Sequence, residues 1–357
     1  MIIIDGSIGE GGGQVLRTSI ALAALLGKEI KIVNIRAKRP RPGLQRQHLV
    51  SVKAVAEIAG AEVEGLRLGS TQLVFRPRDI RSGSFRFDIG TAGSVTLVMQ
   101  AILPVVGFAP GPISVEIRGG TDVPWSPPVD YMRFVFSRIL DHFGLMVSIV
   151  VKRRGHYPRG GGIVLLKVPD PPRRLNSVAM VERGEILGIE GLSHAVRLPR
   201  HVAERQARSA EEFLRKKLGS IPIKIDIEWY SPERDPHRGP GSGIVLWAYT
   251  TNSVIGGDAL GAKGKRAEVV GQEAAQKLYE DLASGKALDR HASDMVIPFA
   301  AISCGESIIG GARLTMHAWT NIKVVELLVP EAEIEFIEGG DLGKPFSARI
   351  RGICLKK

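Results

Sequence analysis

Short hydrophobic runs alternate with polar, glycine-rich turns along this chain, and several of these turns lead directly into an apolar helix. Residues 1–5 (MIIID) predict a buried strand, residues 9–13 a glycine turn, and residues 14–26 a helix that Gly27 ends. The same order of strand, small-residue turn and apolar helix recurs across residues 84–106. These recurrences predict an α/β (α+β) fold assembled from repeated βα units.

Further along the chain the pattern continues and then changes. A strand at 113–118 and a helix at 129–143 predict a third copy of the unit in the first half of the chain. Residues 169–174 (PDPPRR) mark a boundary. Beyond it, a strand at 185–191 and an amphipathic helix at 201–218 (HVAERQARSAEEFLRKKL) predict a smaller α+β unit.

The last part of the chain returns to polar turns that precede apolar helices. We therefore predict a large domain in two parts, residues 1–179 and 278–357, interrupted by a small α+β insert domain at residues 180–277. The second half of the large domain is expected to close onto the first half around the insert.

The amino-acid composition gives the chain a large positive net charge. Hydrophobic residues make up 44% and charged residues 24% of the chain, as in ordinary folded proteins. The net charge of +11 and the pI near 9.8 are unusual, and they predict attraction to polyanions, nucleic acid first and anionic membrane second. The alternative is a basic surface that serves solubility alone.

The two cysteines, Cys304 and Cys354, are too few for a disulfide framework and lack metal-ligand spacing, so they predict a reducing cytosol. Cys304 lies in an apolar run and is predicted to be a core residue. The longest apolar run, residues 95–109, is interrupted by Gln100 and Pro104 and is too short to span a bilayer. With no signal-peptide pattern at the N-terminus, we predict a cytoplasmic protein, and many Arg and Glu residues suggest a thermophile.

The glycine turn at residues 9–13 is the first candidate site. A strand, a glycine turn and a helix N-terminus together direct free backbone N–H groups at an anion. Glu10 and Arg17 lie beside that point, so the turn is a candidate to hold a metal ion, a phosphate, or both. The alternative is a turn that serves tight packing, because GEGGGQ matches neither GxGxxG nor GxxxxGK[ST].

A polar and basic segment, residues 36–48, is the second candidate. It combines four arginines and one lysine with two glutamines and a histidine, and its two prolines stiffen the loop. Guanidinium groups bind phosphates in a bidentate manner, which predicts a phosphate or nucleic-acid surface. A solvated basic face is the alternative.

Seven segments in register along nearly the whole chain resemble the RNA 3'-terminal phosphate cyclases. They are GEGGGQVLRT, RPGLQRQHL, GTAGS with its Gln100, GGTDVPWSPPVDY, YPRGGG, PRHVAER and MHAWTNIKVVE. The resemblance implies a large domain of repeated βα units related to the enolpyruvyl transferases, with a small inserted domain. It also implies an enzyme that uses ATP and Mg²⁺ or Mn²⁺ to adenylate a histidine, passes AMP to an RNA 3'-phosphate, and forms a 2',3'-cyclic phosphate.

The resemblance also assigns roles to residues of this chain. The matching nucleophile is His317, and Glu10 matches a position near the metal. The residues that match the phosphate-handling surface are Arg17, Arg36, Arg39, Gln47 and His48. The residues that match the adenosine pocket are Gln100, Pro127, Tyr131, His291, Ala292, Ser293, Asp294 and Met295.

Other interpretations of these residues exist. His291 and Met295 replace the aromatic and amide side chains that are common in the family, so the contacts to adenine are open. Taken alone, His317 would be a structural histidine, Tyr131 a core aromatic residue, and Asp294 a carboxylate at a helix N-terminus.

Two rival functions share parts of the pattern. A non-catalytic, cyclase-like RNA-binding ribosome assembly factor would lack the histidine that is present here as His317. An enzyme related to the enolpyruvyl transferases would share the fold but not the motifs. The partners expected for a cyclase are RNA with a 3'-phosphate end and ATP, and an exposed sheet edge would permit a homodimer.

Overall fold

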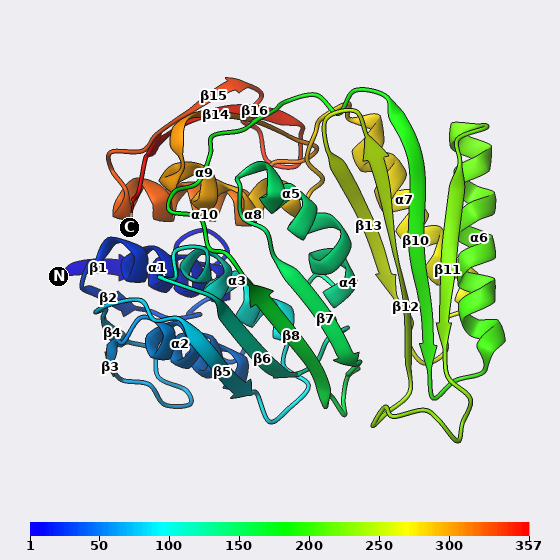
Figure 1. Ribbon diagram of the computed structural model, residues 1–357, viewed down its shortest axis with the longest axis horizontal. Helices are drawn as coiled ribbons and strands as arrows, with labels where there is room; N and C mark the ends of the chain where they lie inside the picture. The colour runs from blue at the N-terminus through cyan, green and yellow to red at the C-terminus, as the bar shows by residue number, and fades with distance from the viewer. Residues whose placement is uncertain (357) are drawn as a thin grey trace.

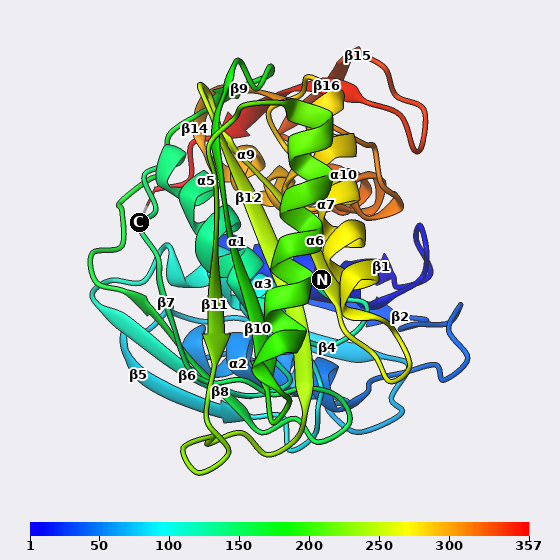
Figure 2. The same cartoon turned by 90° about the vertical axis from the view of Figure 1, so that its right-hand side faces the viewer.

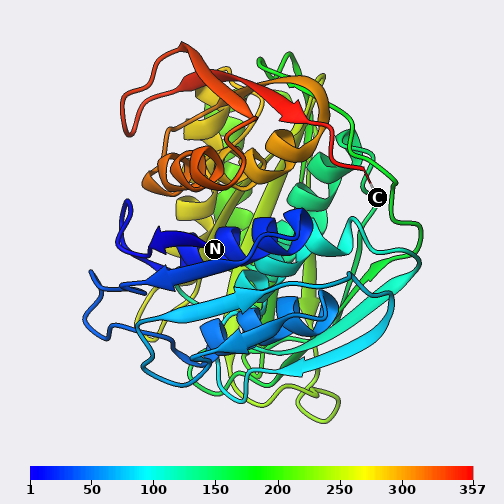
Figure 3. The same ribbon diagram turned by 90° about the vertical axis from the view of Figure 1, so that its left-hand side faces the viewer.

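Four four-stranded sheets form the framework of the protein, as a computed structural model describes it for residues 1–356. Three of the sheets lie around a central group of helices, and the fourth stands to one side with two helices of its own (Figures 1 and 3). The predicted α/β fold of repeated βα units is confirmed.

The first repeat contains two strand–helix pairs followed by two further strands. Its sheet has the order β1-β2-β4-β3, with β1 and β2 parallel and the other neighbours antiparallel. Its elements are β1 (Ile2–Asp5), α1 (Gly13–Leu26), β2 (Ile30–Val33), α2 (Arg46–Ile58), β3 (Glu62–Glu64) and β4 (Leu73–Arg76).

The second repeat has the same topology, with the sheet order β5-β6-β8-β7 and β5 parallel to β6. Its strands are β5 (Gly83–Asp88), β6 (Ile113–Gly119), β7 (Ser148–Arg153) and β8 (Gly162–Val168). Its helices are α3 (Val95–Val106) and one continuous stretch formed by α4 (Val129–Tyr131), the π-helix η1 (Met132–Phe136) and α5 (Ser137–His142). The strand at 113–118 and the helix at 129–143 are confirmed as a further βα unit, and the pairing of β6 with β5 places this unit in the second repeat.

The third repeat lies mostly in the last part of the chain and starts with a two-residue strand. Its sheet order, β9-β14-β16-β15, repeats the topology of the other two. Its elements are β9 (Ala179–Met180), α8 (Ala292–Met295), α9 (Ile297–Ile302), β14 (Cys304–Gly311), α10 (Met316–Leu328), β15 (Glu333–Glu338) and β16 (Phe346–Ile353). Because β9 and β14 are parallel neighbours in one sheet, the chain leaves this sheet after β9 and forms a further sheet before it returns to α8, α9 and β14.

The interruption is the fourth sheet, with the order β11-β10-β12-β13. Its elements are β10 (Ile186–Val196), α6 (Arg200–Leu218), β11 (Ile223–Trp229), β12 (Gly241–Thr250), β13 (Val254–Leu260) and α7 (Ala267–Ala283). Figure 2 shows α6 and α7 side by side against this sheet, and a second hydrophobic cluster lies between them and the strands. The domain boundaries at residues 180 and 277 stay a prediction, and α7 extends past the second of them.

The main hydrophobic core lies between the first three sheets. Every residue of α1 from Gln14 to Leu25 is buried, as are most residues of α3, and a helix that is buried on all sides belongs at the centre of a core. Pro104 inside α3 is accommodated near its C-terminal end. Within residues 1–356, no helix combines the length and apolar character that crossing a membrane requires.

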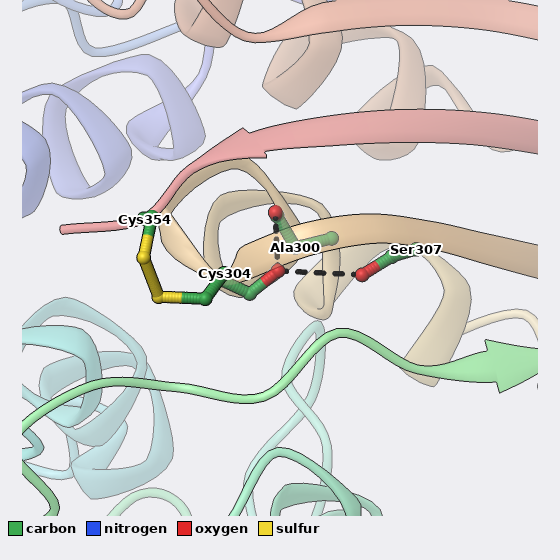
Figure 4. The surroundings of a disulfide bond; sticks show 5 residues. Ala300, Cys304, Ser307 and Cys354 are labelled. Carbon is green, nitrogen blue, oxygen red and sulfur yellow. Dashed lines mark hydrogen bonds between the residues drawn. A yellow bond between two sulfur atoms is a disulfide. The ribbon is translucent and has the colours of Figure 1, made fainter.

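The structure contradicts the prediction that the two cysteines are reduced. Cys304 and Cys354 form a disulfide (Figure 4), and both are half-buried rather than core residues. The bond follows from the register of the antiparallel pair β14 and β16, which places Cys304 opposite Ile353, next to Cys354. A separation of 50 residues hides this proximity in the sequence. The inference of a reducing compartment from cysteine usage therefore fails.

Loss of this disulfide is expected to lower the free energy of unfolding by about 2–4 kcal/mol, because the bond restricts the unfolded chain. Thermal unfolding of the protein with and without reductant measures the effect. Cys304→Ser serves as the control, since its unfolding should no longer respond to reductant. An unchanged transition, together with free thiols in the denatured, unreduced chain, would show that the bond does not form.

Candidate active site

Glu10 and His317 come from opposite ends of the chain and meet between the N-termini of α1 and α10. The distance from His317 Nδ1 to Glu10 Oε1 is 3.2 Å, and Arg39 Nη2 lies 2.9 Å from the same oxygen. Burial lowers the pKa of His317 below its ordinary value, although the charge of Glu10 acts in the opposite direction. The imidazole is therefore neutral at neutral pH, with Nδ1 facing the carboxylate.

A buried hydrogen-bond network fixes α1 against α10. Asn321 Oδ1 accepts hydrogen bonds from Gln14 Nε2 at 2.9 Å and from Thr18 Oγ1 at 2.6 Å. The amide of Asn321 donates to the Asp294 carbonyl at 2.7 Å, which adds α8 to the network. At Gly9 a Cβ would lie 2.1 Å from Thr320 Oγ1, so only glycine permits this approach of the turn to α10.

Arg17 supplies a buried positive charge beside this pair. The residue is 5% exposed, and Nη2 donates to Gln14 Oε1 at 2.7 Å, while Nε is buried without a hydrogen-bond partner. Burial lowers the pKa of Arg17 to about 10, against the opposing charges of Asp294 and Glu10, so the guanidinium stays protonated at neutral pH. No carboxylate among residues 1–356 forms a salt bridge with Arg17. The site thus contains a cation with unused hydrogen-bonding capacity.

His48 lies in the first turn of α2 and faces the glycine turn. A Cβ at Gly13 would lie 2.6 Å from His48 Nε2 and 2.9 Å from Arg17 Nη1, so the missing side chain leaves room between the two. The Gln45 backbone N–H donates to His48 Nδ1 at 3.2 Å. Burial, together with the charges of Arg17 and Arg36, lowers the pKa of His48 to about 3, so this imidazole is also neutral.

Two residues of the predicted phosphate surface form hydrogen bonds with the protein backbone instead of facing the site. Arg36 adopts a left-handed conformation (φ 55°), and Nη1 donates to the carbonyls of Arg41 at 2.6 Å and Gly43 at 2.9 Å. Gln47 Oε1 accepts the Ser94 backbone N–H at 3.0 Å, at the start of α3. The structure therefore brings Glu10, Arg17, Arg39, His48 and His317 together and places Arg36 and Gln47 in supporting contacts.

The residues predicted for the adenosine pocket lie around α3, α4 and α8. Gln100 Nε2 lies 3.2 Å from Met295 Sδ, and both line a small pocket with Gln14 and Asn321. The Pro127 carbonyl accepts Thr96 Oγ1 at 2.8 Å. Gln14 of α1 and Asn321 of α10 connect this pocket to the helices whose N-terminal ends carry the Glu10–His317 pair.

Tyr131 and the turn at residues 291–295 are organised by an aspartate that the sequence analysis did not single out. Asp289 Oδ1 accepts the Tyr131 hydroxyl at 2.7 Å and the backbone N–H groups of His291 and Ala292, both at 2.9 Å. The rings of Tyr131 and His291 meet edge to face, 5.6 Å apart. An aspartate three residues before a short helix, able to accept from the first backbone N–H groups, is the signal that would have indicated this role.

Ser293 and Asp294 are buried inside that turn. Ser293 Oγ lies close to the carbonyls of Arg290 and Arg313. Burial, reinforced by the charge of Asp289, raises the pKa of Asp294 well above its ordinary value. Asn321 was also missed, although an amide within the apolar pattern of α10 is a signal for a buried hydrogen bond.

Comparison with known proteins gives one consistent family. The model of the RNA 3'-terminal phosphate cyclases matches residues 8–334. The RNA 3'-terminal phosphate cyclase of Hyperthermus butylicus is 71% identical and that of Ignicoccus hospitalis 60% identical, covering 100% of this chain and 99% and 100% of the relatives. The cyclase of Staphylothermus marinus is 54% identical, covering 99% of both chains.

Among solved structures, the EPSP synthase from Acinetobacter baumannii aligns with a TM-score of 0.29 and 11% identity, covering 98% of this chain and 65% of the other. The similarity in sequence is far stronger, and it extends over the glycine turn, the basic segment and α10. The chain belongs to the RNA 3'-terminal phosphate cyclase family.

Proposed function

We propose that this protein is an ATP-dependent RNA 3'-terminal phosphate cyclase, which converts an RNA 3'-phosphate end to a 2',3'-cyclic phosphate through a covalent histidine–AMP intermediate. One observation carries the proposal: His317 faces Glu10 at 3.2 Å, with the buried cation Arg17 beside them. Nucleotidyl transfer needs a nucleophile and charges that stabilise the phosphoryl group. The site supplies a neutral imidazole, a carboxylate, and a guanidinium that forms no salt bridge within the described part of the chain.

The residues present fit ATP and a divalent ion. We assign the adenosine to the region of Gln100, Tyr131 and residues 291–295, and the triphosphate to the N-terminus of α1, near Arg17 and Arg39. The unpartnered Nε of Arg17 suits a phosphate oxygen. Glu10 supplies a hard oxygen ligand for Mg²⁺ or Mn²⁺. When bound, such an ion neutralises charge on the phosphoryl oxygens.

His317 is the proposed nucleophile of the first step, a ligase-type nucleotidyl transfer. The negative charge of Glu10, 3.2 Å from Nδ1, favours the tautomer with the proton on Nδ1, which leaves the lone pair of Nε2 free. Nε2 attacks the α-phosphorus, an N–P bond forms, and the bond to the β-phosphate oxygen breaks with release of pyrophosphate. Arg17 stabilises the negative charge that builds up on the phosphoryl oxygens.

The later steps transfer AMP and close the ring. A 3'-phosphate oxygen of the RNA attacks the phosphorus of the adenylated histidine, and the N–P bond breaks to give RNA(3')pp(5')A. The neighbouring 2'-hydroxyl then attacks the 3'-phosphorus, loses its proton, and displaces AMP. Because that hydroxyl is held close to the phosphorus, proximity supplies much of the rate, and only RNA carries it.

The proposed RNA partner is consistent with the net charge of +11 and with the basic loop between β2 and α2. Lys38 and Arg41 of this loop and Arg46 at the start of α2 are exposed, so they are available to RNA phosphates. We retain the cytoplasm as the expected compartment, because intracellular proteins of hyperthermophiles contain disulfides. The homodimer stays an expectation.

Turnover of end-labelled RNA tests this function. An oligonucleotide with a 3'-phosphate is expected to become resistant to phosphatase in the presence of ATP and Mg²⁺ or Mn²⁺, whereas the same RNA with a 3'-hydroxyl is expected to stay unchanged. As a matched control, a 2'-deoxy terminal nucleotide with a 3'-phosphate should accept AMP but not cyclise. Equal conversion of the phosphate and hydroxyl ends would refute the substrate assignment.

A further inference from the structure

A buried cluster of charged residues lies where the β5–β8 sheet meets the β10–β13 sheet, separate from the residues around His317. Its centre is Arg154, which is 1% exposed. The guanidinium nitrogens lie 3.3 Å from Asp122 Oδ2, 2.6 Å from Asp130 Oδ2 and 2.6 Å from Glu228 Oε2. Three carboxylates facing one guanidinium leave a formal excess of two negative charges (3 − 1).

Two histidines adjoin this cluster and face each other. His156 follows β7 and His194 belongs to β10, and their Nε2 atoms are 3.0 Å apart. The two residues are 7% and 1% exposed. A pair of neutral imidazoles can form one hydrogen bond between these nitrogens. The Nδ1 atoms of both rings and Oδ1 of Asp122 are buried without any hydrogen-bond partner.

The excess negative charge of this cluster is buried, and Asp122 Oδ1 is buried without a partner. Buried groups of this kind are costly unless they have a partner. A cation bound beside Asp122 and between the two imidazoles would supply that partner.

We propose that Asp122, His156 and His194 bind one divalent transition-metal ion, with Zn²⁺ as the best fit. One potential ligand atom from each of the three residues lies within 4.8 Å of the other two. Two imidazole nitrogens and a carboxylate oxygen are a normal ligand set for zinc. Tetrahedral coordination at Zn–N distances of about 2.0–2.1 Å spaces two nitrogens by roughly 3.3 Å. The observed separation of 3.0 Å is close to this value.

The surroundings indicate what such an ion would do. Asp122 Oδ2 is held by Thr121 Oγ1 at 2.6 Å and by Arg154, which leaves Oδ1 for the metal. A Cβ at Gly241 would lie 2.0 Å from the His156 ring, so β12 packs directly against this imidazole. Two ligands come from the second repeat and the third from the inserted sheet. The ion would therefore join the two units and take no part in the chemistry at His317.

Cobalt and zinc titrations of the chelator-treated, full-length protein test the proposal. We expect binding of one Co²⁺ per chain with the visible absorption of a four-coordinate ion, and displacement of the cobalt by Zn²⁺. Bound Zn²⁺ should raise the unfolding temperature. His194→Gln and Asp122→Asn should lose the cobalt absorption and the zinc-dependent rise. His201→Gln, an exposed histidine at the start of α6, is the matched control and should retain both.

A second control separates this cluster from the metal site proposed at Glu10. His317→Gln should bind cobalt and zinc like the wild type, because His317 takes no part in the cluster. The proposal is overturned if the folded wild type shows neither cobalt absorption nor zinc retention, or if His317→Gln loses binding that His194→Gln retains. Near-ultraviolet circular dichroism establishes whether each variant is folded. If a variant does not fold, the titration of the wild type still tests whether the protein binds the metal.

Discussion

The His317→Ala variant is expected to take up no label from α-³²P-ATP, whereas the wild type becomes covalently labelled in the presence of Mg²⁺ or Mn²⁺. The expected loss is about 10⁴-fold or more, because no other group can replace the nucleophile of a covalent step. The labelled wild type should lose AMP in acid and keep it in alkali, as a phosphoramidate does. Acid precipitation followed by scintillation counting measures this difference.

The controls separate the nucleophile from the fold. His201→Ala alters an exposed histidine and should be labelled like the wild type. His317→Ala should still cyclise a prepared RNA(3')pp(5')A, since ring closure uses only the neighbouring 2'-hydroxyl. Label that persists in His317→Ala, or that maps to a peptide outside α10, would exclude His317 as the acceptor of AMP.

Replacement of Arg17 by methionine should reduce the rate of adenylation by about a thousandfold, which corresponds to about 4 kcal/mol of transition-state stabilisation. The side chains are of similar length, but methionine supplies neither the charge nor the N–H groups. Arg17 forms no salt bridge within residues 1–356, and burying such a cation disfavours folding. The variant should therefore unfold at the same temperature as the wild type or higher.

Single-turnover labelling and thermal unfolding, measured on the same preparations, check both effects of Arg17→Met. Arg138→Met, which alters an exposed arginine on α5, is the matched control and should change neither quantity. If Arg17→Met lowers the unfolding temperature and leaves adenylation within tenfold of the wild type, Arg17 is a structural residue.

Local patterns in the sequence were sufficient for most of the helices and for the repeated βα order. The strand at 1–5 and the helix at 14–26 could be predicted because the spacing of hydrophobic residues and the glycines that end an element are local features of the sequence. The first strand of the third repeat could not, since β9 has two residues and shows no periodicity. For this reason the third repeat, which begins with β9, was not foreseen as a unit of its own.

The candidate site was only partly accessible to the same reasoning. The glycine turn indicated an anion site next to Glu10 and Arg17, but only the family resemblance connected it to His317. The contact between Glu10 and His317 depends on the packing of α1 against α10, which no local pattern encodes. The roles of Arg36 and Gln47 depend equally on tertiary structure, because their partners are backbone groups of folded loops.

The interruption of the third repeat between β9 and β14 has a consequence for the order of folding. Parallel pairing of these strands must close a loop of more than a hundred residues, and the entropy cost of closure delays such contacts. The inserted sheet shortens that path, because Arg183 and Gly285 at its two ends are joined by a backbone hydrogen bond. We therefore expect the inserted sheet to fold before the sheet of β9 and β14, and His317 to reach Glu10 late in folding.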